Sequence, residues 1–491
     1  MRRIVYLVHR WTAIAMCILL ALWFGSGMVM LFVGYPKLMT SERLGALPAL
    51  PVQGCCVDMA DVTDLTLTSI RGRPHFVLRA ADGRLTAVDA ASGKAAEAVG
   101  PAEAVAGAGA FGGGVPAVYS GLVTEDRWTH SRALNPHRPL HVVELGDAAA
   151  TRVYVSSTTG QVVLDAPRGE RAWNYVGAWL HWLYMLRSQP VDPVWTWTII
   201  VISSIGVLSA VTGIVNGVWR WRFAGRYKNG SRTPYREAFM RWHHLLGLTF
   251  GAILCTWIFS GLMSMNPVGM FDAGNAPDMA AYRGADGAPP AVGAGTAVRL
   301  LRGAGFVPVE LEWRVLDGQP FILARDRLAR TRLVMGNAVL ERWPAARLRH
   351  AAARLLPARI VAEDALTEYD RFYFARGSAS MYGGDARGLP AVRFAFDDAG
   401  ATLVYVDPRT GEVALSLDRA QRAGRWLFNL LHSWDLPVLL DGGWSRDAVL
   451  ILLSLGGLGL SVTGIVIGVR RIRASAGAAA LINSVPSQRK I

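Results

Sequence analysis

Four histidines occur at matched positions of a duplicated segment, and the neutral imidazole is the commonest metal ligand among side chains. An offset of 234 residues (243 − 9) aligns His9 with His243 without a gap. A second offset of 251 residues (432 − 181) aligns His181 with His432. The two offsets also superpose Trp23 on Trp257, Ser26 on Ser260, Gly27 on Gly261, Gly206 on Gly457 and Thr212–Val215 on Thr463–Val466. Because two imidazoles can occupy both axial positions of a heme iron, this repeat predicts bis-histidine heme ligation.

The spacing of the histidines predicts two pairs at different membrane depths. From His9 to Gly27 is 18 residues (27 − 9), roughly 27 Å of helix at ~1.5 Å per residue. That length is close to the ~30 Å of bilayer hydrocarbon. We therefore predict that His9 and His243 bind one heme near the cytoplasmic side, and that His181 and His432 bind a second near the opposite side. The chain has no Cys-x-x-Cys-His motif, so two noncovalent b hemes are expected.

The elements that position these histidines are predicted to be membrane helices. The chain is 52% hydrophobic, and four apolar stretches have the roughly 17–25 residues that cross a bilayer. The stretches are Trp11–Val33, which is too long for a signal peptide, and Val194–Val218, Leu245–Met265 and Ala448–Val469. We expect an α-helical membrane protein with four transmembrane helices in two pseudo-symmetric pairs and two exported α+β domains.

The predicted segments follow one another twice in the same order. They are transmembrane helix 1 (9–33), exported domain 1 (34–172), an interfacial helix (173–187), transmembrane helix 2 (194–219), a cytoplasmic loop (220–241), transmembrane helix 3 (243–265), exported domain 2 (266–425), a second interfacial helix (426–440), transmembrane helix 4 (446–469) and a cytoplasmic tail (470–491). The two interfacial helices are expected to deliver His181 and His432 to the outer heme.

The net charge of +14 is concentrated beside the apolar stretches, which does not indicate nucleic-acid binding. The cations at these boundaries are Arg2, Arg3, Arg10, Arg220, Arg222, Arg226, Lys228, Arg232, Arg236, Arg241, Arg470, Arg471 and Arg473. By the positive-inside rule, both termini and the 220–241 loop are cytoplasmic. In a bacterium the two long segments would then be periplasmic, and the protein would lie in the inner membrane.

The long segments carry a repeated hairpin pattern. Alternating strands broken by a polar turn that ends in glycine occur at 152–163 and 403–413, and a third copy occurs at 85–94. The 403–413 copy contains Asp-Pro-Arg-Thr-Gly-Glu-Val, whereas the 152–163 copy has Ser156 in place of Asp407. Residues 345–356 read as a helix, so the domains are expected to be α+β.

This hairpin resembles the PepSY domain, and its position between paired helices with histidines near their ends is similar to the PepSY-associated transmembrane family. The resemblance extends from His9 to about Arg473. It implies four membrane helices, two b hemes and, in some members, an inner-membrane ferric-siderophore reductase.

Several further residues are candidates with an alternative structural role. Arg10, Arg220 and Arg241 could pair with inner heme propionates, and Arg187 and Arg425 with outer ones, although interfacial arginines are common. Gly213, Gly217, Gly464 and Gly468 could face a porphyrin or simply allow close helix contact. His244 is a weaker ligand candidate because it points away from His243. Adjacent Cys55 and Cys56 are not expected to bridge each other. A metal site at His137 and His141 is disfavoured by Pro136 and Pro139.

Two functions fit this sequence. The first is a ferric reductase that takes electrons from a cytoplasmic donor and reduces a ferric siderophore or other ferric chelate outside, releasing Fe(II). No nicotinamide or flavin motif is present in a suitable context, so the donor would be a separate molecule. A docking surface could include Tyr369, Tyr373 and Tyr382, although core packing fits each equally well. The alternative function is a membrane-anchored PepSY regulator or inhibitor of proteases without redox activity.

Overall fold

A computed structural model describes residues 1–52, 55–57, 59, 64–80, 82–188, 192–284, 292–376, 387–440 and 443–483. The chain divides into two units. The helical unit contains Met1–Val33, Tyr175–Asp272 and Ala423–Ile491, and the β-rich unit contains Gly34–Asn174 and Ala273–Arg422. All four predicted ligand histidines belong to the helical unit.

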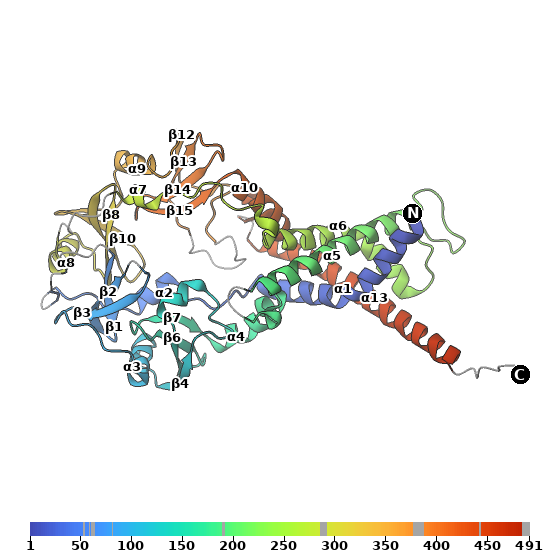
Figure 1. Cartoon of the computed structure of the whole chain (residues 1–491), viewed down its shortest axis with the longest axis horizontal. Coiled ribbons are helices and arrows are strands. Elements are labelled where there is room, and N and C mark those ends of the chain that lie inside the picture. The colour runs from blue at the N-terminus through green and yellow to red at the C-terminus, as the bar shows by residue number, and fades with distance from the viewer. Residues whose placement is uncertain are drawn as a thin grey trace, which may run out of the picture. The chain divides into compact units, whose positions relative to one another are not determined.

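Four long helices form the helical unit (Figure 1): α1 (Arg2–Met30), α5 (Pro193–Arg220), α6 (Ala238–Ser264) and α13 (Trp444–Asn483). Each is long and apolar enough to cross a membrane, α13 over Trp444–Ala476. Helix α1 packs against α5 and α13, and α6 packs against the same two helices, so the four close into a ring. Their shared core includes Met16, Leu20, Phe24, Ala210, Leu254, Ile258 and Leu460. The four expected membrane helices are therefore present.

The helices extend beyond the apolar stretches that predicted them. Helix α1 begins at Arg2 and α6 at Ala238, so His9 and His243 lie inside helices rather than at their first residues. Glu237 caps α6 by accepting the Met240 N–H at 2.7 Å. Arginine and lysine can continue a membrane helix because their heads reach water while their stems stay apolar.

Each predicted interfacial helix is broken into short pieces. Before His181 the chain forms a π-helical turn, η2 (Tyr175–Trp179), and a 3-10 turn follows it, η3 (Tyr184–Leu186). Before His432 it forms a second π-helical turn, η5 (Trp426–Leu430), followed by α11 (Leu431–Ser433) and α12 (Pro437–Leu440). Two residues after each histidine the backbone turns left-handed, at Leu183 (φ 53°) and Trp434 (φ 53°). Short helical pieces therefore take the place of the single helix predicted over 173–187 and of the one predicted over 426–440.

The β-rich unit contains three antiparallel sheets. One has seven strands in the order β11-β10-β9-β8-β1-β2-β3, and the others have the orders β4-β5-β6-β7 and β12-β13-β14-β15. The strands are β1 (Leu65–Ile70), β2 (Arg73–Arg79), β3 (Leu85–Asp89), β4 (Ala117–Val123), β5 (Leu140–Leu145), β6 (Arg152–Ser156), β7 (Val162–Ala166), β8 (Glu310–Leu316), β9 (Gln319–Arg325), β10 (Thr331–Met335), β11 (Ala338–Leu340), β12 (Ile360–Leu366), β13 (Ala391–Phe396), β14 (Leu403–Asp407) and β15 (Glu412–Leu417).

Short helices accompany these sheets. They are α2 (Thr40–Gly45), α3 (Pro101–Phe111), η1 (Arg132–His137), α4 (Arg168–Asn174), α7 (Met279–Arg283), α8 (Ala294–Gly303), α9 (Ala345–Ala352) and α10 (Arg419–Arg425). The α+β character expected of these segments is confirmed.

The seven-stranded sheet joins the two long segments into one unit. Strand β1 from the first segment pairs with β8 from the second, with Leu65 opposite Trp313. Arg43 donates two hydrogen bonds to buried Glu310, at 2.5 and 2.8 Å, and so links the segments again. Residues 34–172 and 266–425 therefore do not form two separate domains.

The predicted hairpins at 152–163 and 403–413 are present as β6–β7 and β14–β15. Each contributes a fully buried tyrosine that donates to an aspartate, Tyr154 to Asp126 at 2.6 Å and Tyr405 to Asp370 at 2.9 Å. Tyr373 is also fully buried and stacks on Tyr405 at 5.0 Å. Core packing therefore accounts for Tyr373, and Tyr382 lies outside the described residues.

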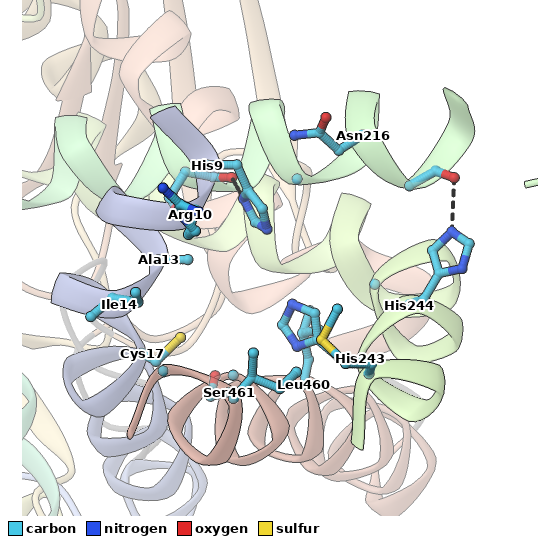
Figure 2. Close-up of a pocket in the computed structure, with 18 of the residues that line it drawn as sticks. His9, Arg10, Ala13, Ile14, Cys17, Asn216, His243, His244, Leu460 and Ser461 are labelled. Carbon is cyan, nitrogen blue, oxygen red and sulfur yellow. Dashed lines mark hydrogen bonds between the residues drawn. The ribbon is translucent and has the colours of Figure 1, made fainter. Parts of the chain in front are cut away.

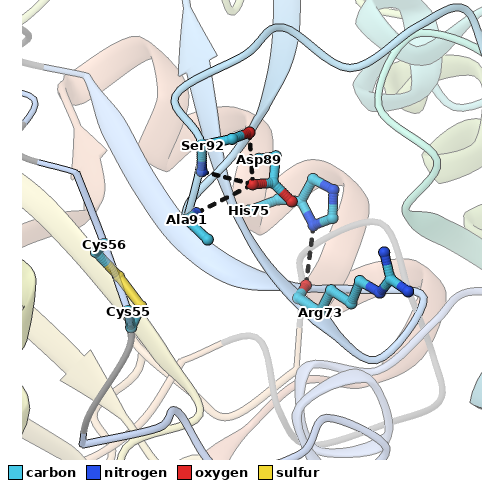
Figure 3. The surroundings of a disulfide bond; sticks show 7 residues. All are labelled: Cys55, Cys56, Arg73, His75, Asp89, Ala91 and Ser92. Carbon is cyan, nitrogen blue, oxygen red and sulfur yellow. Dashed lines mark hydrogen bonds between the residues drawn. A yellow bond between two sulfur atoms is a disulfide. The ribbon is translucent and has the colours of Figure 1, made fainter.

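Cys55 and Cys56 form a disulfide, contrary to the expectation from sequence (Figure 3). Both pack against the core beneath the seven-stranded sheet, near the turn after β3 where Asp89 accepts the Ala91 and Ser92 N–H groups. The free cysteines, Cys17 and Cys255, lie on helices of the other unit.

Candidate functional site

The structure brings the four histidines together in the two predicted pairs. The ring centroids of His9, on α1, and His243, on α6, lie 6.3 Å apart with an interplanar angle of 35°. Those of His181 and His432 lie 6.1 Å apart with an angle of 73°. Each pair contains one histidine from each half of the chain.

The hydrogen bonds of these histidines determine which ring nitrogen carries the proton. Nδ1 of His9 lies 3.0 Å from the Ser209 carbonyl oxygen. A carbonyl can only accept, so Nδ1 of His9 must be the N–H donor. The neutral ring then has its lone pair on Nε2, which is the protonation state that a metal-binding imidazole requires.

The other three histidines reach the same state through hydroxyl groups. Nδ1 lies 3.1 Å from Ser26 Oγ in His181, 2.9 Å from Ser260 Oγ in His432 and 3.1 Å from Thr463 Oγ1 in His243. Each hydroxyl also donates to a carbonyl of its own helix: Ser26 to Leu22 at 2.7 Å, Ser260 to Trp257 at 2.9 Å and Thr463 to Leu460 at 2.8 Å. A hydroxyl has a single proton, so it must accept from the imidazole. All four rings therefore carry the proton on Nδ1.

The distance between the rings fits a metal held between two Nε2 atoms. Imidazole–metal bonds are about 2.0–2.1 Å long, so two opposed ligands place their ring centroids about 6 Å apart. Within the described parts of the chain, Nε2 of His9, His243, His181 and His432 has no hydrogen-bond partner. The described residues also contain no group of three or more His, Cys, Asp or Glu side chains that could hold a metal ion. Two imidazoles alone leave most coordination positions open, and a porphyrin would supply the four equatorial nitrogens.

His244 differs from its neighbour His243 because both of its ring nitrogens are engaged. Nδ1 lies 2.6 Å from Thr233 Oγ1, and Nε2 lies 2.9 Å from the Gly217 carbonyl oxygen. His244 therefore has no free ring nitrogen for a metal, and it ties the loop before α6 to the end of α5.

A cavity of about 620 Å³ surrounds His9 and His243 (Figure 2). It is lined by all four long helices, and the two rings face one another across it. Ligand pockets for small molecules and cofactors have about 300–1,000 Å³, so the volume fits a heme. The outer pair, His181 and His432, does not line this cavity.

Two of the repeated glycines leave no room for a side chain beside the inner pair. A Cβ at Gly213 would lie 2.7 Å from Cε1 of His9. A Cβ at Gly464 would lie 2.5 Å from Cys17 Sγ and 3.4 Å from Cε1 of His243. By contrast, a Cβ at Gly217 would make a tight contact of 3.3 Å with Leu248, and a Cβ at Gly468 would make an ordinary contact of 3.4 Å with Ile14. Gly213 therefore makes room for the His9 ring and Gly464 for the Cys17 thiol beside His243, whereas Gly217 and Gly468 lie against aliphatic side chains.

Only one of the three arginines predicted at the inner site lines the cavity. Arg10 does, and its Nε is buried without a hydrogen-bond partner in the described part of the chain. Arg220 instead stacks on Tyr6 and Tyr235 at 5.1 and 5.7 Å, and Arg241 is exposed. Sequence reasoning missed Arg470 and Arg471, which do line the cavity, because they follow the last apolar stretch without a histidine nearby.

Near the outer pair, one of the two arginines expected there, Arg425, belongs to a buried ionic cluster with Asp435 and Arg446. Arg425 donates to the Asp435 carbonyl oxygen at 3.2 Å, and Arg446 donates to the Ser433 carbonyl oxygen at 2.6 Å. Arg446 also lies 3.5 Å from the Asp435 carboxylate. These contacts fix the chain just after His432. Arg187 stacks on Tyr184 at 4.9 Å. Charged residues at the edge of apolar segments were the available signal for Arg446 and Asp435.

The histidines of the β-rich unit have structural partners. Nδ1 of His141 lies 3.1 Å from the Tyr119 hydroxyl, and its Nε2 lies 2.8 Å from the Val99 carbonyl oxygen. His137 lies on η1 and His141 on β5, so they share no helix. Burial lowers the pKa of His137 to about 4.

Comparison with known proteins identifies the family. A family model described as PepSY-associated TM region matches residues 6–471. No curated protein matches the chain.

Proposed function

Because the chain belongs to the PepSY-associated TM region family, we propose that it is a di-heme membrane oxidoreductase that passes electrons to a ferric chelate such as a ferric siderophore. The observation that carries this proposal is the geometry of the two histidine pairs. Both have centroid separations of about 6 Å, and all four rings carry their proton on Nδ1. A membrane-anchored regulator of proteases does not require rings paired in this way.

The proposed ligands are His9 with His243 and His181 with His432. A heme in each pair would supply a one-electron Fe(III)/Fe(II) couple. The residues around each pair have separate tasks. Ser26, Ser260, Thr463 and the Ser209 carbonyl fix ring orientation and proton position, and the surrounding apolar helices exclude water.

The direction of transfer follows from the positive-inside rule. The start of α1, the 221–237 loop and the residues after 469 carry the cations, so we assign this basic end of the bundle to the cytoplasm of a bacterium. His9 and His243 would then face a cytoplasmic donor, and His181 and His432 would serve the exported side. Cysteine labelling from outside intact cells should reach Lys94→Cys in the β-rich unit and not Lys228→Cys.

The proposed reaction is outer-sphere. If His9, His243, His181 and His432 all hold heme iron, the acceptor would have no place to bind the iron. One electron would then pass from a reduced heme to a Fe(III) chelate, which would become a Fe(II) chelate as the heme is oxidised. Siderophores bind Fe(III) through hard oxygen donors, and Fe(II) is bound less tightly, so iron would be released. The rate should then depend on docking and driving force, and several chelates should be accepted.

The test is reoxidation of the reduced protein in vesicles of known orientation. A ferric siderophore added at the exported face should reoxidise it and yield Fe(II) that a ferrous chelator traps. Carbon monoxide should inhibit little. Strong inhibition by carbon monoxide would indicate an open heme position, and failure of every ferric chelate would disprove ferric reductase activity.

A further inference from the structure

The inner cavity is polar at one end and apolar at the other. Its walls include Leu20 and Leu254 at the apolar end. Leu20 lies 11 residues (20 − 9) beyond His9 on α1, roughly 16 Å deeper into the bundle at ~1.5 Å per residue. At the basic end the walls include Tyr6, Tyr235, Glu237, Arg470 and Arg471. The two histidines lie between these ends.

Arg10 follows the proposed ligand His9 directly in the sequence. Its side chain has unused hydrogen-bonding capacity. Its guanidinium lies 5.7 Å from the Tyr6 ring and 5.2 Å from the Trp11 ring, which hold it in place. Its buried Nε has no partner among the described residues. Arg470, by comparison, donates to Glu237 at 2.8 Å. A buried N–H of a guanidinium without an acceptor is costly, so an acceptor is expected in the cavity.

We propose that Arg10 binds a carboxylate of the inner cofactor, which is oriented with its carboxylates toward the basic end and its apolar edge toward Leu20 and Leu254. This inference rests on the proposed function. An amphipathic ligand with two carboxylates at one edge matches a cavity with this polarity, and guanidinium is the side chain best suited to carboxylates. Arg10 is then a positioning residue that also sets the reduction potential.

This orientation turns the apolar edge toward the outer pair. Leu20 lies six residues (26 − 20) before Ser26, the residue that holds His181, which is roughly 9 Å along α1 at ~1.5 Å per residue. The carboxylate edge is turned toward the proposed donor side. Entry and exit of electrons would thus use opposite edges of the inner cofactor.

The test uses Arg10→Gln, Arg10→Lys and, as the matched control, Arg241→Gln at the same end of the bundle. The inner heme signal is first identified as the one that His243→Ala removes. Loss of the Arg10 charge should lower the inner potential, because a nearby cation favours the reduced and less positive iron. At a fixed ambient potential, the ratio of reduced to oxidised inner heme should be about tenfold lower in Arg10→Gln than in the unmodified protein. This corresponds to a fall of about 59 mV in the reduction potential for one electron.

The propionate bending band in resonance Raman spectra should shift in Arg10→Gln and return in Arg10→Lys. Arg241→Gln should change neither readout. Loss of the inner heme in Arg10→Gln with retention in Arg10→Lys would also support the assignment. Two hemes with an unchanged inner potential and propionate band in Arg10→Gln would overturn it and leave the proposed function standing. Absence of heme from the unmodified protein would refute the proposed function instead.

Discussion

Ser260 lies 2.9 Å from Nδ1 of His432, and because its hydroxyl proton is donated to the Trp257 carbonyl, it accepts the imidazole N–H. Ser26 stands in the same relation to His181. An acceptor at Nδ1 makes an imidazole a stronger electron donor to iron and stabilises Fe(III).

Ser260→Ala should therefore raise the reduction potential of the outer heme and weaken its binding about 10-fold to 100-fold. The inner heme should be unaffected. Ser264→Ala is the matched control, because Ser264 lies one turn further along α6 and only donates to the Gly261 carbonyl. Potentiometric titration of both hemes checks this. Equal shifts in the two serine variants would mean that the Ser260 hydroxyl has no specific role.

Gly213→Ala should remove the inner heme selectively. The new Cβ would lie 2.7 Å from Cε1 of His9, so the ring must move out of register with His243. We expect inner-heme affinity to fall at least about tenfold, as for other changes that misplace a ligand. Gly247→Ala is the control, because its Cβ would make an ordinary 3.8 Å contact with Leu460 in the same cavity. The heme content of both purified variants decides the matter, and equal retention would contradict the proposed ring position.

His244→Ala should keep both hemes and destabilise the protein. The substitution removes the contacts to Thr233 and to the Gly217 carbonyl, each worth about 0.5–1.5 kcal/mol. The thermal midpoint should fall while the heme spectrum is unchanged. Loss of the inner heme with a normal midpoint would show that His244, rather than His243, is the ligand.

Asp165 makes the β-rich unit sensitive to pH. Burial, reinforced by the charges of Glu42 and Glu170, raises its pKa to about 6. A carboxyl group whose pKa is raised on folding adds stability below its unfolded pKa of about 4 and loses it as pH rises through about 6. Asp165→Asn should therefore be more stable than the unmodified protein at pH 8, by about 1–2 kcal/mol after allowance for partial exposure.

The difference between the Asp165→Asn and unmodified proteins should vanish below about pH 3, where the carboxyl is neutral in both the folded and the unfolded states. His137, whose pKa burial lowers to about 4, has the opposite pH dependence but is common to both proteins and cancels. Thermal unfolding midpoints across this range provide the measurement. A difference that is independent of pH would mean that the carboxyl does not titrate as stated.

The membrane helices and the histidine pairs were predictable because both depend on local patterns. The length of an apolar stretch predicts a membrane-spanning helix. The gap-free repeat predicts from the sequence alone that His9 pairs with His243. The π-helical turns before His181 and His432 were not predictable, because a single extra residue per turn leaves no periodic signal. The sharing of the seven-stranded sheet by β1 and β8 was also missed, since pairing between distant strands is decided by tertiary packing.

The roles of individual polar residues were the least predictable. Arg10, Arg220 and Arg241 were equally good candidates from the sequence. Only the positions of their side chains show that Arg10 lines the cavity and the other two do not. Tyr154 and Tyr405 appear in similar hairpins, but their aspartate partners, Asp126 and Asp370, lie in loops that differ by one inserted residue. Which hydroxyl holds which imidazole depends on the contact between helices and not on either helix alone.

Pyridine hemochrome analysis of the unmodified protein, His9→Ala and His181→Ala, each purified with heme supplied, tests whether each histidine pair holds a heme. We expect about two b hemes per chain in the unmodified protein and about one in each variant, with the two variants retaining hemes of different reduction potential. No heme in the unmodified protein, or the same heme lost in both variants, would contradict it.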